Sequence, residues 1–447
     1  MKNHMNSKKN KPDISLLVFK GTLLVVVFLL GGFLAKSDFV PFELIEKGLK
    51  DTEKLAEETT RQRPMLLDKN IYKGDGVTIH KQDQAYQGLT VMQGWFPEGP
   101  QARLVDMDGN VIHTWMIDFF EIWDKPEHIY PERNIPKTRF NYHTMGLVVL
   151  RDGSIVANVQ NQGAVKLDKC GEVIWTVDRM THHSVTPTED GGFWMPGNRD
   201  LRKVPDDLLF LGITREKLMK SWGRYENVLL YVDANGEIKK EFSVLQAVAD
   251  ANFEHQIYDA MMIRENDPTH TNDIEIVTEA LAAKLDNISA GDLLVSIRQF
   301  HMLAIFDQDD GRIKWHQSGP WVRQHDPDIT EEGDISVFNN RNYHVNLNKV
   351  PGSNITVLDP ATRQARIVYP QTGQKRFYSD IMGNNQALPN GNMLIIETRR
   401  GRVFEIDAGG DVVWEYVKMY DEEYAALIEW AERYDADYFA VNDWACD

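Results

Sequence analysis

Histidines that recur at one position of a repeated pattern are the residues of this chain best suited to chemistry. The clearest case is QHDPDITEEGDISVFNN from Gln324, in which His325 precedes an acidic-glycine turn and a second strand. The same layout recurs as HTMGLVVLRDGSIVANV from His143 and HHSVTPTEDGGFWMPGNR from His182. Each repeat could pack an apolar residue there, so the repeated imidazoles predict a shared pocket. Near neutral pH an imidazole can act as a nucleophile, a general acid or a charged donor.

A second pattern indicates which elements must position these histidines. Each copy has an apolar strand, an Asp, a tight turn that usually holds Gly, and a second strand that often ends in Trp. The copies begin at Ala102, Ala164, Leu229, Leu303, Ile355 and Val403. Such a pattern is typical of a β-hairpin. Its repetition at intervals of roughly 50–75 residues predicts an all-β, six-bladed β-propeller with tryptophans packed between the blades.

Further hairpins are expected to supply the inner strands of the blades. They are predicted at 143–160, 183–199, 325–340 and 385–399. In one repeat, strands near His255 and Asp292 are expected to take this place, with residues 265–290 as an insertion that could form a lid. The first unit lacks an innermost strand. We expect a short C-terminal helix around 421–434, followed by a closing strand at 438–444.

In a propeller, the first residues of the inner strands and the last residues of the second strands meet at one mouth of the central channel. The side chains predicted to converge there are His143, His182, His183, His255, His325, Arg199, Arg298, Arg399 and Asn340. Such a cationic pocket suits a small oxyanion. No carboxylate cluster shares these positions, so metal-assisted and two-carboxylate mechanisms are disfavoured and no metal is expected. Neither a P-loop nor a dinucleotide-binding glycine motif is present, and we expect no cofactor.

Several of these motifs resemble the bacterial arylsulfotransferase family. The likeness rests on the HH of THHSV, the SIR before IFDQDDGRIKW, and the QHD-to-VFNN segment, and it covers most of residues 85–416. It implies a six-bladed propeller that transfers a sulfuryl group from a phenolic sulfate ester to another phenol. The resemblance also implies that the enzyme needs no nucleotide sulfate donor and passes through a sulfated histidine.

The resemblance assigns roles to individual residues. His325 would be the nucleophile, Arg298 would hold the sulfate, and His255 with the His182–His183 pair would be the remaining channel histidines. Protonated His255 or His183 would return the proton to the phenolate in a ping-pong scheme. From their positions in the repeats, and not from the resemblance, further substrate contacts are predicted for His182, His143, Arg199, Asn340 and Arg399.

The sequence departs from the family's pattern at two places. His255 is followed by Gln-Ile-Tyr-Asp, where the family usually has an asparagine two residues on. Asn339–Asn340 replaces the usual Asp-Asn pair. The first departure removes an amide that would contact the sulfate.

Two alternatives to a sulfuryl transferase stay open. One is a non-catalytic, membrane-anchored propeller that binds an anionic or aromatic ligand or a partner protein. The other is a different propeller enzyme, such as a lactonase or a quinoprotein dehydrogenase. The latter would need channel carboxylates with calcium, or a tryptophan that stacks on the quinone, and the sequence shows neither.

The net charge limits the kind of partner that the chain can bind, and the N-terminal sequence indicates its cellular compartment. The formal net charge of −18 argues against nucleic acid, and the partners expected are a small-molecule aryl sulfate and a phenol. A basic tail (1–13) precedes an apolar run (14–35) that is long enough for a transmembrane signal anchor. This predicts a single-pass protein of the inner (cytoplasmic) membrane. Its helical stalk or linker (36–76) and its catalytic propeller (77–447) would lie on the periplasmic side, and a homodimer remains an open alternative.

The two cysteines, Cys170 and Cys446, are far apart in sequence and do not form a metal-site motif. A bridge between them is feasible in an oxidising compartment, but we expect them not to pair.

Overall fold

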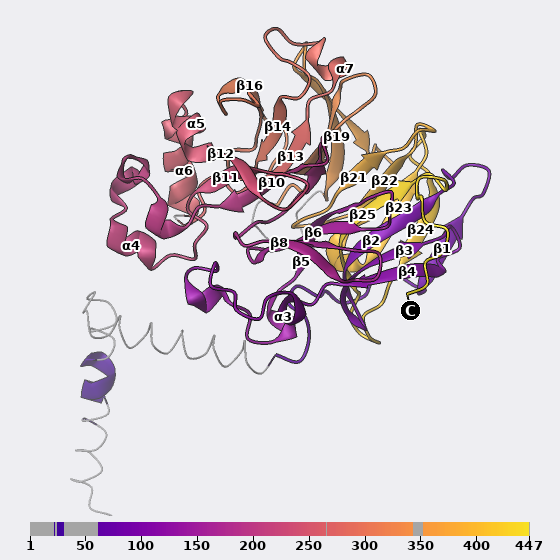
Figure 1. The fold of residues 1–447 in the computed structure, drawn as a ribbon, viewed down its shortest axis with the longest axis horizontal. Helices are drawn as coiled ribbons and strands as arrows, with labels where there is room; N and C mark the ends of the chain where they lie inside the picture. Colours follow the sequence, from indigo (N-terminus) through magenta and orange to yellow (C-terminus); the bar gives the residue numbers. More distant parts are fainter. Residues whose placement is uncertain (1–21, 23–24, 31–60, 265, 343–351, 447) are drawn as a thin grey trace, which may run out of the picture. The chain divides into compact units, whose positions relative to one another are not determined.

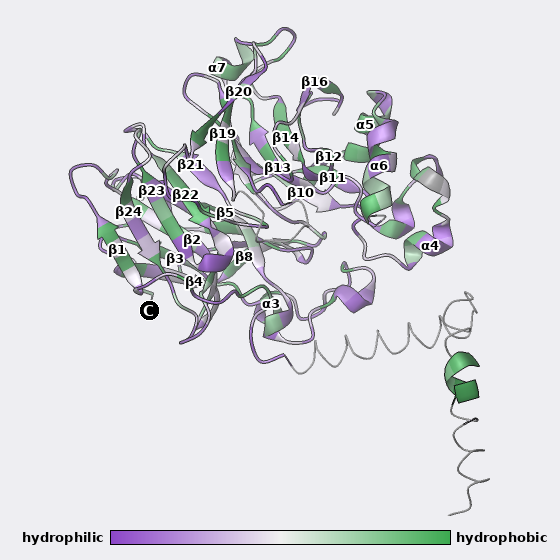
Figure 2. Cartoon of the chain, turned by 180° about the vertical axis from the view of Figure 1, so that it is seen from behind, coloured by the Kyte–Doolittle hydropathy of each residue, from purple (hydrophilic) through white to green (hydrophobic). Residues whose placement is uncertain are grey.

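The computed structural model describes residues 22, 25–30, 61–264, 266–342 and 352–446. Residues 1–61 and 62–447 form separate compact units. The predicted basic tail (1–13) and most of the predicted anchor (14–35) lie outside the described residues. The described part of the anchor, 25–30, is helical, hydrophobic and exposed (Figure 2). No helix within the described ranges is long and apolar enough to cross a membrane.

Residues 36–60 of the predicted stalk (36–76) lie outside the described residues, and its part from residue 62 onward belongs to the larger unit. Residues 61–76 contain no helix up to the start of β1 (Gly76–His80). Arg399 donates to the carbonyl oxygen of Leu66 (2.9 Å) and to the carboxylate of Asp68 (3.1 Å). This segment therefore packs against the strands rather than forming a free helix.

Six antiparallel sheets make up the described part of the larger unit, as the predicted six-bladed propeller requires (Figure 1). Blades 1 to 3, from the innermost strand outward, are β25 (Leu427–Tyr434), β2 (Leu89–Phe96), β3 (Gly99–Val105), β4 (Val111–Met116); β5 (Thr144–Val149), β6 (Ile155–Val159), β7 (Gly163–Leu167), β8 (Val173–Val177); and β9 (Thr186–Pro187), β10 (Phe193–Asn198), β11 (Asn227–Val232), β12 (Ile238–Ser243). Blades 4 to 6 are β13 (Thr271–Ile276), β14 (Leu293–Ile297), β15 (Met302–Phe306), β16 (Ile313–Ser318); β17 (His325–Ile329), β18 (Ile335–Asn339), β19 (Asn354–Asp359), β20 (Gln364–Tyr369); and β21 (Asn385–Ala387), β22 (Met393–Glu397), β23 (Arg402–Ile406), β24 (Val412–Val417), with β1 outermost. The inner hairpins predicted at 143–160, 183–199, 325–340 and 385–399 are confirmed.

The repeated Asp-turn motif has one local cause. In the first copy, Asp106 Oδ1 accepts from the backbone N–H groups of Asp108 (3.0 Å) and Asn110 (2.8 Å). Gly109 provides the positive φ of 85° that the turn requires. The Asp carboxylates of the other five copies accept turn N–H groups in the same way: Asp168, Asp233, Asp307, Asp359 and Asp407.

The recurring tryptophans join neighbouring blades, as predicted. Trp115, Trp175 and Trp414 each donate an indole N–H to a turn carbonyl of the next blade, on Gly153 (3.1 Å), Ala234 (3.0 Å) and Met107 (2.9 Å), respectively. Trp315 lies in a hydrophobic cluster with Leu358 of the next blade. Trp115 and Trp414 therefore combine apolar burial with a satisfied donor, whereas the indole N–H of Trp315 has no hydrogen-bond partner within the described residues.

The C-terminal part of the chain closes the ring, but through a different segment from the one predicted. Residues 427–434 are not a helix: they form β25, which pairs with β2 along its whole length. Residues 438–444 are not a strand. Tyr438 instead donates its hydroxyl to the carbonyl of Val149 (3.0 Å), and the ring of Trp444 packs on His113 and Trp115.

The expectation that the cysteines stay unpaired is wrong, because Cys170 and Cys446 form a disulfide. The C-terminal tail carries Cys446 back to the β7–β8 turn, where Cys170 lies. Lys169 of the same turn donates to the carbonyl groups of Asp443 and Ala445, both at 2.8 Å.

The helices are short and lie between or beyond the strands. They are α3 (Phe119–Ile122), α4 (Arg215–Met219), α5 (Val244–Asp250), α6 (Glu254–Arg264) and α7 (Glu279–Ala282). His255 is exposed on α6, so the prediction that it begins an inner strand is wrong. The inner strand of blade 4 is β13, which lies inside the predicted insertion and lid (265–290).

Candidate active site

The QHD segment is fixed between three blades. Gln324 donates to Ser296 Oγ and to the carbonyl of Met302 in blade 4, both at 3.0 Å. Asp326 Oδ2 accepts from the side-chain amide of Asn385 in blade 6 (2.9 Å). The polar residues on either side of His325 therefore anchor the start of β17 and leave the histidine directed at the channel.

His325 is held in one tautomer by Asn340. The amide nitrogen of Asn340 donates to the carbonyls of Ser379 (3.0 Å) and Met382 (2.7 Å), so its Oδ1 must face the imidazole. His325 Nδ1 then donates to that oxygen (2.7 Å), which leaves a lone pair on Nε2. Burial, and then the charge of Arg298, lower the pKa of His325 to about 3. The ring is therefore neutral at pH 7.

A pair of histidines faces His325 from blade 3. The Nδ1 atoms of His182 and His183 lie 2.8 Å apart, so one ring donates to the other and the pair cannot be doubly protonated. The ring of His183 lies 6.1 Å from that of His325. Burial lowers the pKa of His182 to about 4, and burial together with neighbouring cationic groups holds the pKa of His183 well below its ordinary value.

The channel histidine of blade 4 is His270, which the sequence analysis missed. Its ring lies 5.3 Å from that of His183, and its Nδ1 is hydrogen-bonded to Asp267. Asn272 stands two residues after it and donates to the carbonyl of Gln324 (2.8 Å). The His-x-Asn spacing that is absent after His255 is thus present in HTN, and this spacing was the signal that could have identified His270.

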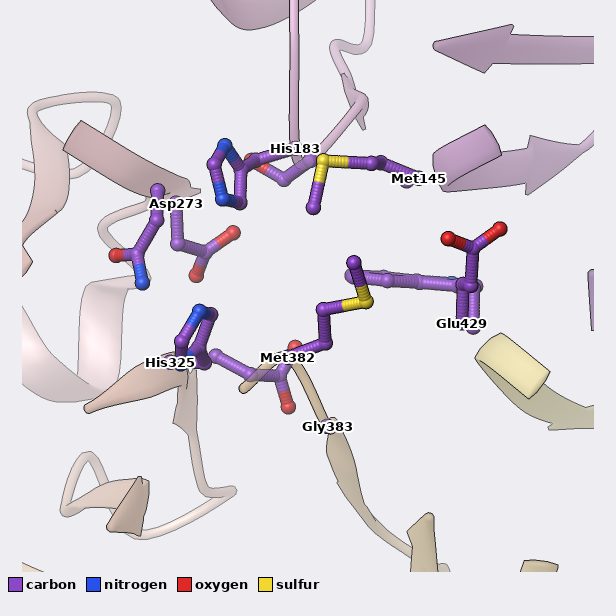
Figure 3. Close-up of a pocket in the computed structure, with 12 residues that line it drawn as sticks. Met145, His183, Asp273, His325, Met382, Gly383 and Glu429 are labelled. Atoms are coloured by element: carbon purple, nitrogen blue, oxygen red, sulfur yellow. The ribbon is translucent and has the colours of Figure 1, made fainter. Parts of the chain in front are cut away.

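One pocket lies on the propeller axis. Two consecutive residues from each blade line it: Met145–Gly146, His183–Ser184, Asn272–Asp273, His325–Asp326, Met382–Gly383 and Glu429–Trp430. It holds about 320 Å³ of empty space, part of it open to solvent. Figure 3 shows His183, Asp273 and His325 on one side of the pocket, with the thioethers of Met145 and Met382 between this group and Glu429. Histidines distant in the chain therefore meet around one axis.

A second, more polar pocket adjoins the first at His183. It is lined by Gln160, Asn161, His182, His183, Asn198, Arg224, Asn227, Asp267, His270 and Thr271. Many of these residues lie at the ends of β6 and β10 or just before β11 and β13. This pocket therefore lies at the channel mouth where the inner strands begin, and the first pocket lies further along the inner strands.

The predicted arginines have different surroundings. Arg298 is buried, and its charge helps to lower the pKa values of both His183 and His325, which places it beside the histidines. Arg199 instead pairs with Glu226 (3.0 Å) and Glu241 (2.9 Å), and Arg399 pairs with Asp68 and Asp380. None of the three arginines is among the residues that line the two pockets.

The side chains of two other predicted substrate contacts, His143 and Asn340, are hydrogen-bonded to protein groups. His143 is hydrogen-bonded through Nδ1 to Glu429 of the closing strand, and Thr144 donates to the same carboxylate (2.8 Å). Asn340 uses all of its polar atoms to hold His325 and two backbone carbonyls. Both residues therefore support the walls of the site.

Carboxylates also line the channel, contrary to the expectation from sequence. Alternating positions of the inner strands carry Asp273 and Glu275 on β13, Asp326 and Asp328 on β17, and Glu432 on β25. Burial, and then the charge of Asp328, raise the pKa of Asp273 to about 7. Burial, and then the charge of Asp273 and other channel carboxylates, raise the pKa of Glu275 well above its ordinary value. No group of three or more residues with metal-binding geometry occurs in the part of the chain that the structure describes.

Comparison with known proteins gives one family. The family model described as "Arylsulfotransferase (ASST)" matches residues 146–419. No curated protein matches the chain.

Similar solved structures include a Bacteroides caccae protein of unknown function, with a TM-score of 0.47 and 11% identity over 76% of this chain and 97% of that one. A virginiamycin B lyase from Staphylococcus aureus has a TM-score of 0.35 and 11% identity over 62% and 71% of the two chains. A streptogramin B lyase has a TM-score of 0.40 and 13% identity over 80% and 88%. These similarities are too weak to bear on function.

Proposed function

Because the chain belongs to the arylsulfotransferase (ASST) family, we propose that it transfers a sulfuryl group from a phenolic sulfate ester to a phenolic acceptor through a sulfated His325. The observation that carries this proposal is the state of His325. Its ring is neutral, its Nδ1–H is bound to Asn340, and its Nε2 lone pair is left for the channel. A buried, oriented and unprotonated imidazole is the form that can attack sulfur.

In the first half-reaction, His325 Nε2 forms a bond to sulfur while the bond from sulfur to the aryl oxygen breaks. The aryl oxygen leaves with the electron pair, and the ring carries the sulfuryl group. In the second half-reaction, an acceptor phenol attacks the same sulfur and restores neutral His325. Such a transfer passes through a loose state with charge spread over the sulfuryl oxygens.

Fixed donors and positive charge would stabilise that state. Arg298 supplies a permanent charge beside His183 and His325, and His183 lines the same pocket as His325. Preorganised groups of this kind act strongly in a buried site, because no solvent has to reorganise during the step. His255, predicted as an acid, lies on α6, and His183 is held neutral, so neither supplies the phenolic proton.

The direct test is turnover of 4-nitrophenyl sulfate with phenol as acceptor, followed by release of nitrophenolate. His325→Ala should abolish transfer, whereas His255→Ala, a histidine change on an exposed helix, should leave it unchanged. Transfer that survives in His325→Ala would exclude the assigned nucleophile. If the wild-type protein transfers nothing to any phenol, the alternative of a ligand-binding propeller gains support.

We also propose that this unit works outside the cytoplasm, anchored in the inner membrane through residues 14–35. Two independent features support this. The N-terminus has the basic-then-apolar order of a signal anchor, and the Cys170–Cys446 disulfide suits an oxidising compartment. Fractionation of cells, with thiol labelling of the unreduced protein, tests the proposal. Recovery in the cytoplasm with two free thiols would contradict it.

A further inference from the structure

Sulfuryl transfer to His325 leaves an aryl oxide that must gain a proton, and the acceptor phenol must later lose one. The surrounding histidines are poor carriers of this proton. His182 and His183 share one proton through their Nδ1 atoms, and burial with neighbouring cationic groups keeps His183 neutral. His325 is the nucleophile itself. A different group in the pocket must therefore exchange the proton.

Asp273 has the geometry for this role. It lines the same axial pocket as His183 and His325, and the three side chains lie on one side of that pocket (Figure 3). The residue is only 1% exposed, and Oδ2 has no hydrogen-bond partner within the described ranges. A buried carboxyl oxygen without a protein partner is costly unless a ligand or a proton occupies it.

The surroundings of Asp273 favour its protonated form. Asp326 and Asp328 of β17, Glu275 of β13 itself and Glu432 of β25 all belong to one group of interacting carboxylates. His183 of blade 3 is neutral, and Arg298, which follows β14, supplies a fixed positive charge at the histidines. Burial raises the pKa of Asp273 most, and the charge of Asp328 raises it further, against hydrogen bonds from Ser184 and the backbone of Ile274 that lower it. The resulting pKa of about 7 is within the range useful for a general acid.

We propose that Asp273 is the general acid of the first half-reaction and the general base of the second, an assignment that rests on the proposed function. As the bond between sulfur and the aryl oxygen breaks, the carboxyl O–H of Asp273 passes its proton to that oxygen and becomes a carboxylate. When the acceptor phenol attacks the sulfated His325, its hydroxyl proton passes to that carboxylate. Protons and charge balance over the cycle without a further reactant.

The alternative proton carrier is the pair formed by His270 and Asp267. The side chains of these two residues are hydrogen-bonded to each other, and the ring of His270 approaches that of His183. This pair, however, lines the polar pocket at the channel mouth and is absent from the lining of the axial pocket. Asp273 is the group in the same pocket as His325.

The test is the dependence of the rate on the leaving group. Phenol, like a tyrosine side chain, has a pKa of about 10 and needs a proton to leave, whereas 4-nitrophenol is far more acidic. In Asp273→Asn, the first half-reaction, followed as single-turnover release of the leaving phenol without an acceptor, should slow about 100-fold or more with phenyl sulfate but less than about threefold with 4-nitrophenyl sulfate. The nitrophenyl donor thus serves as the internal control for folding and for the nucleophile.

Asp328→Asn is the second variant. It removes the charge that raises the pKa of Asp273, so the alkaline fall of the phenyl sulfate rate should move to lower pH while the plateau rate is kept. An equal loss with both donors in Asp273→Asn would overturn the assignment of Asp273 while the proposed function stands. A leaving-group effect in His270→Gln but not in Asp273→Asn would also overturn it. Failure of the wild-type protein with both donors would instead refute the proposed function.

Discussion

Replacing Asn340 by alanine removes three hydrogen bonds at once, only one of which concerns chemistry. The lost bonds are those to Nδ1 of His325 and to the carbonyls of Ser379 and Met382. Both carbonyls belong to buried residues. The change therefore has a structural effect and a chemical effect, and the two can be estimated separately.

The structural effect follows from the two carbonyls. A buried polar group without its partner costs about 1–3 kcal/mol, so the free energy of unfolding should fall by about 2–4 kcal/mol. The chemical effect follows from the bond to His325. That bond should favour the Nδ1–H tautomer by about 1–1.5 kcal/mol, or about tenfold in population. Because the ring also loses its orientation, kcat/KM should fall about 10- to 100-fold.

The assay compares kcat/KM for 4-nitrophenyl sulfate with the thermal midpoint of unfolding. Asn392→Ala is the matched control, because Asn392 also donates twice, to the carbonyl of Gln84 (2.8 Å) and to Glu405 (2.6 Å), in the β21–β22 turn. It should be destabilised to a similar extent with unchanged kcat/KM. An Asn340→Ala protein that is destabilised yet fully active would refute the argument that this amide sets the tautomer of His325.

Three other predictions follow from the fold and the charges. Burial and neighbouring carboxylates raise the pKa of Glu275 above its ordinary value of 4.5. The folded state therefore keeps a proton that the unfolded chain releases. The free energy of unfolding should fall as the pH rises above 4.5. Glu275→Gln should therefore raise the midpoint of unfolding at pH 8 and leave it unchanged near pH 4; a fall at pH 8 would contradict this. Replacing Cys170 and Cys446 by serine should make the C-terminal tail sensitive to protease without loss of activity, because β25 still closes the ring; mass spectrometry of the digest checks this, and an unchanged digest would count against it. In steady-state kinetics, His270→Ala should lower kcat/KM at least about tenfold, whereas His255→Ala should leave it unchanged. The opposite result would contradict the assignment of His270, in place of His255, as the channel histidine of blade 4.

The features that sequence patterns predicted correctly are those with local causes. The Asp106-type turn is closed by hydrogen bonds to N–H groups within four residues, so it appears in the sequence wherever it occurs in the fold. The Trp115-type contacts likewise recur at one place in each hairpin. The position of His325 was predicted because its turn and strand repeat those after His143.

The features that were missed depend on partners far away in the chain. LIEWAERY has the charge spacing of a helix, and only its pairing with β2 makes it a strand. β13 was mistaken for an insertion because Asp273 and Glu275 place charges where an apolar alternation was sought. These charges are tolerated because they face the channel. The disulfide forms because the C-terminal tail runs from β25 to the β7–β8 turn. No local sequence pattern predicts that path.

The central claim is that His325 carries the sulfuryl group between donor and acceptor. The most direct measurement is mass spectrometry of the protein quenched after incubation with an aryl sulfate and no acceptor, with the digest prepared under alkaline conditions that preserve a sulfated imidazole. The peptide that contains Gln324–Asp326 should gain the mass of one sulfuryl group on His325, and subsequent addition of phenol should remove it. A sulfuryl group found on another residue, or transfer that proceeds while the peptide remains unmodified, would contradict the account.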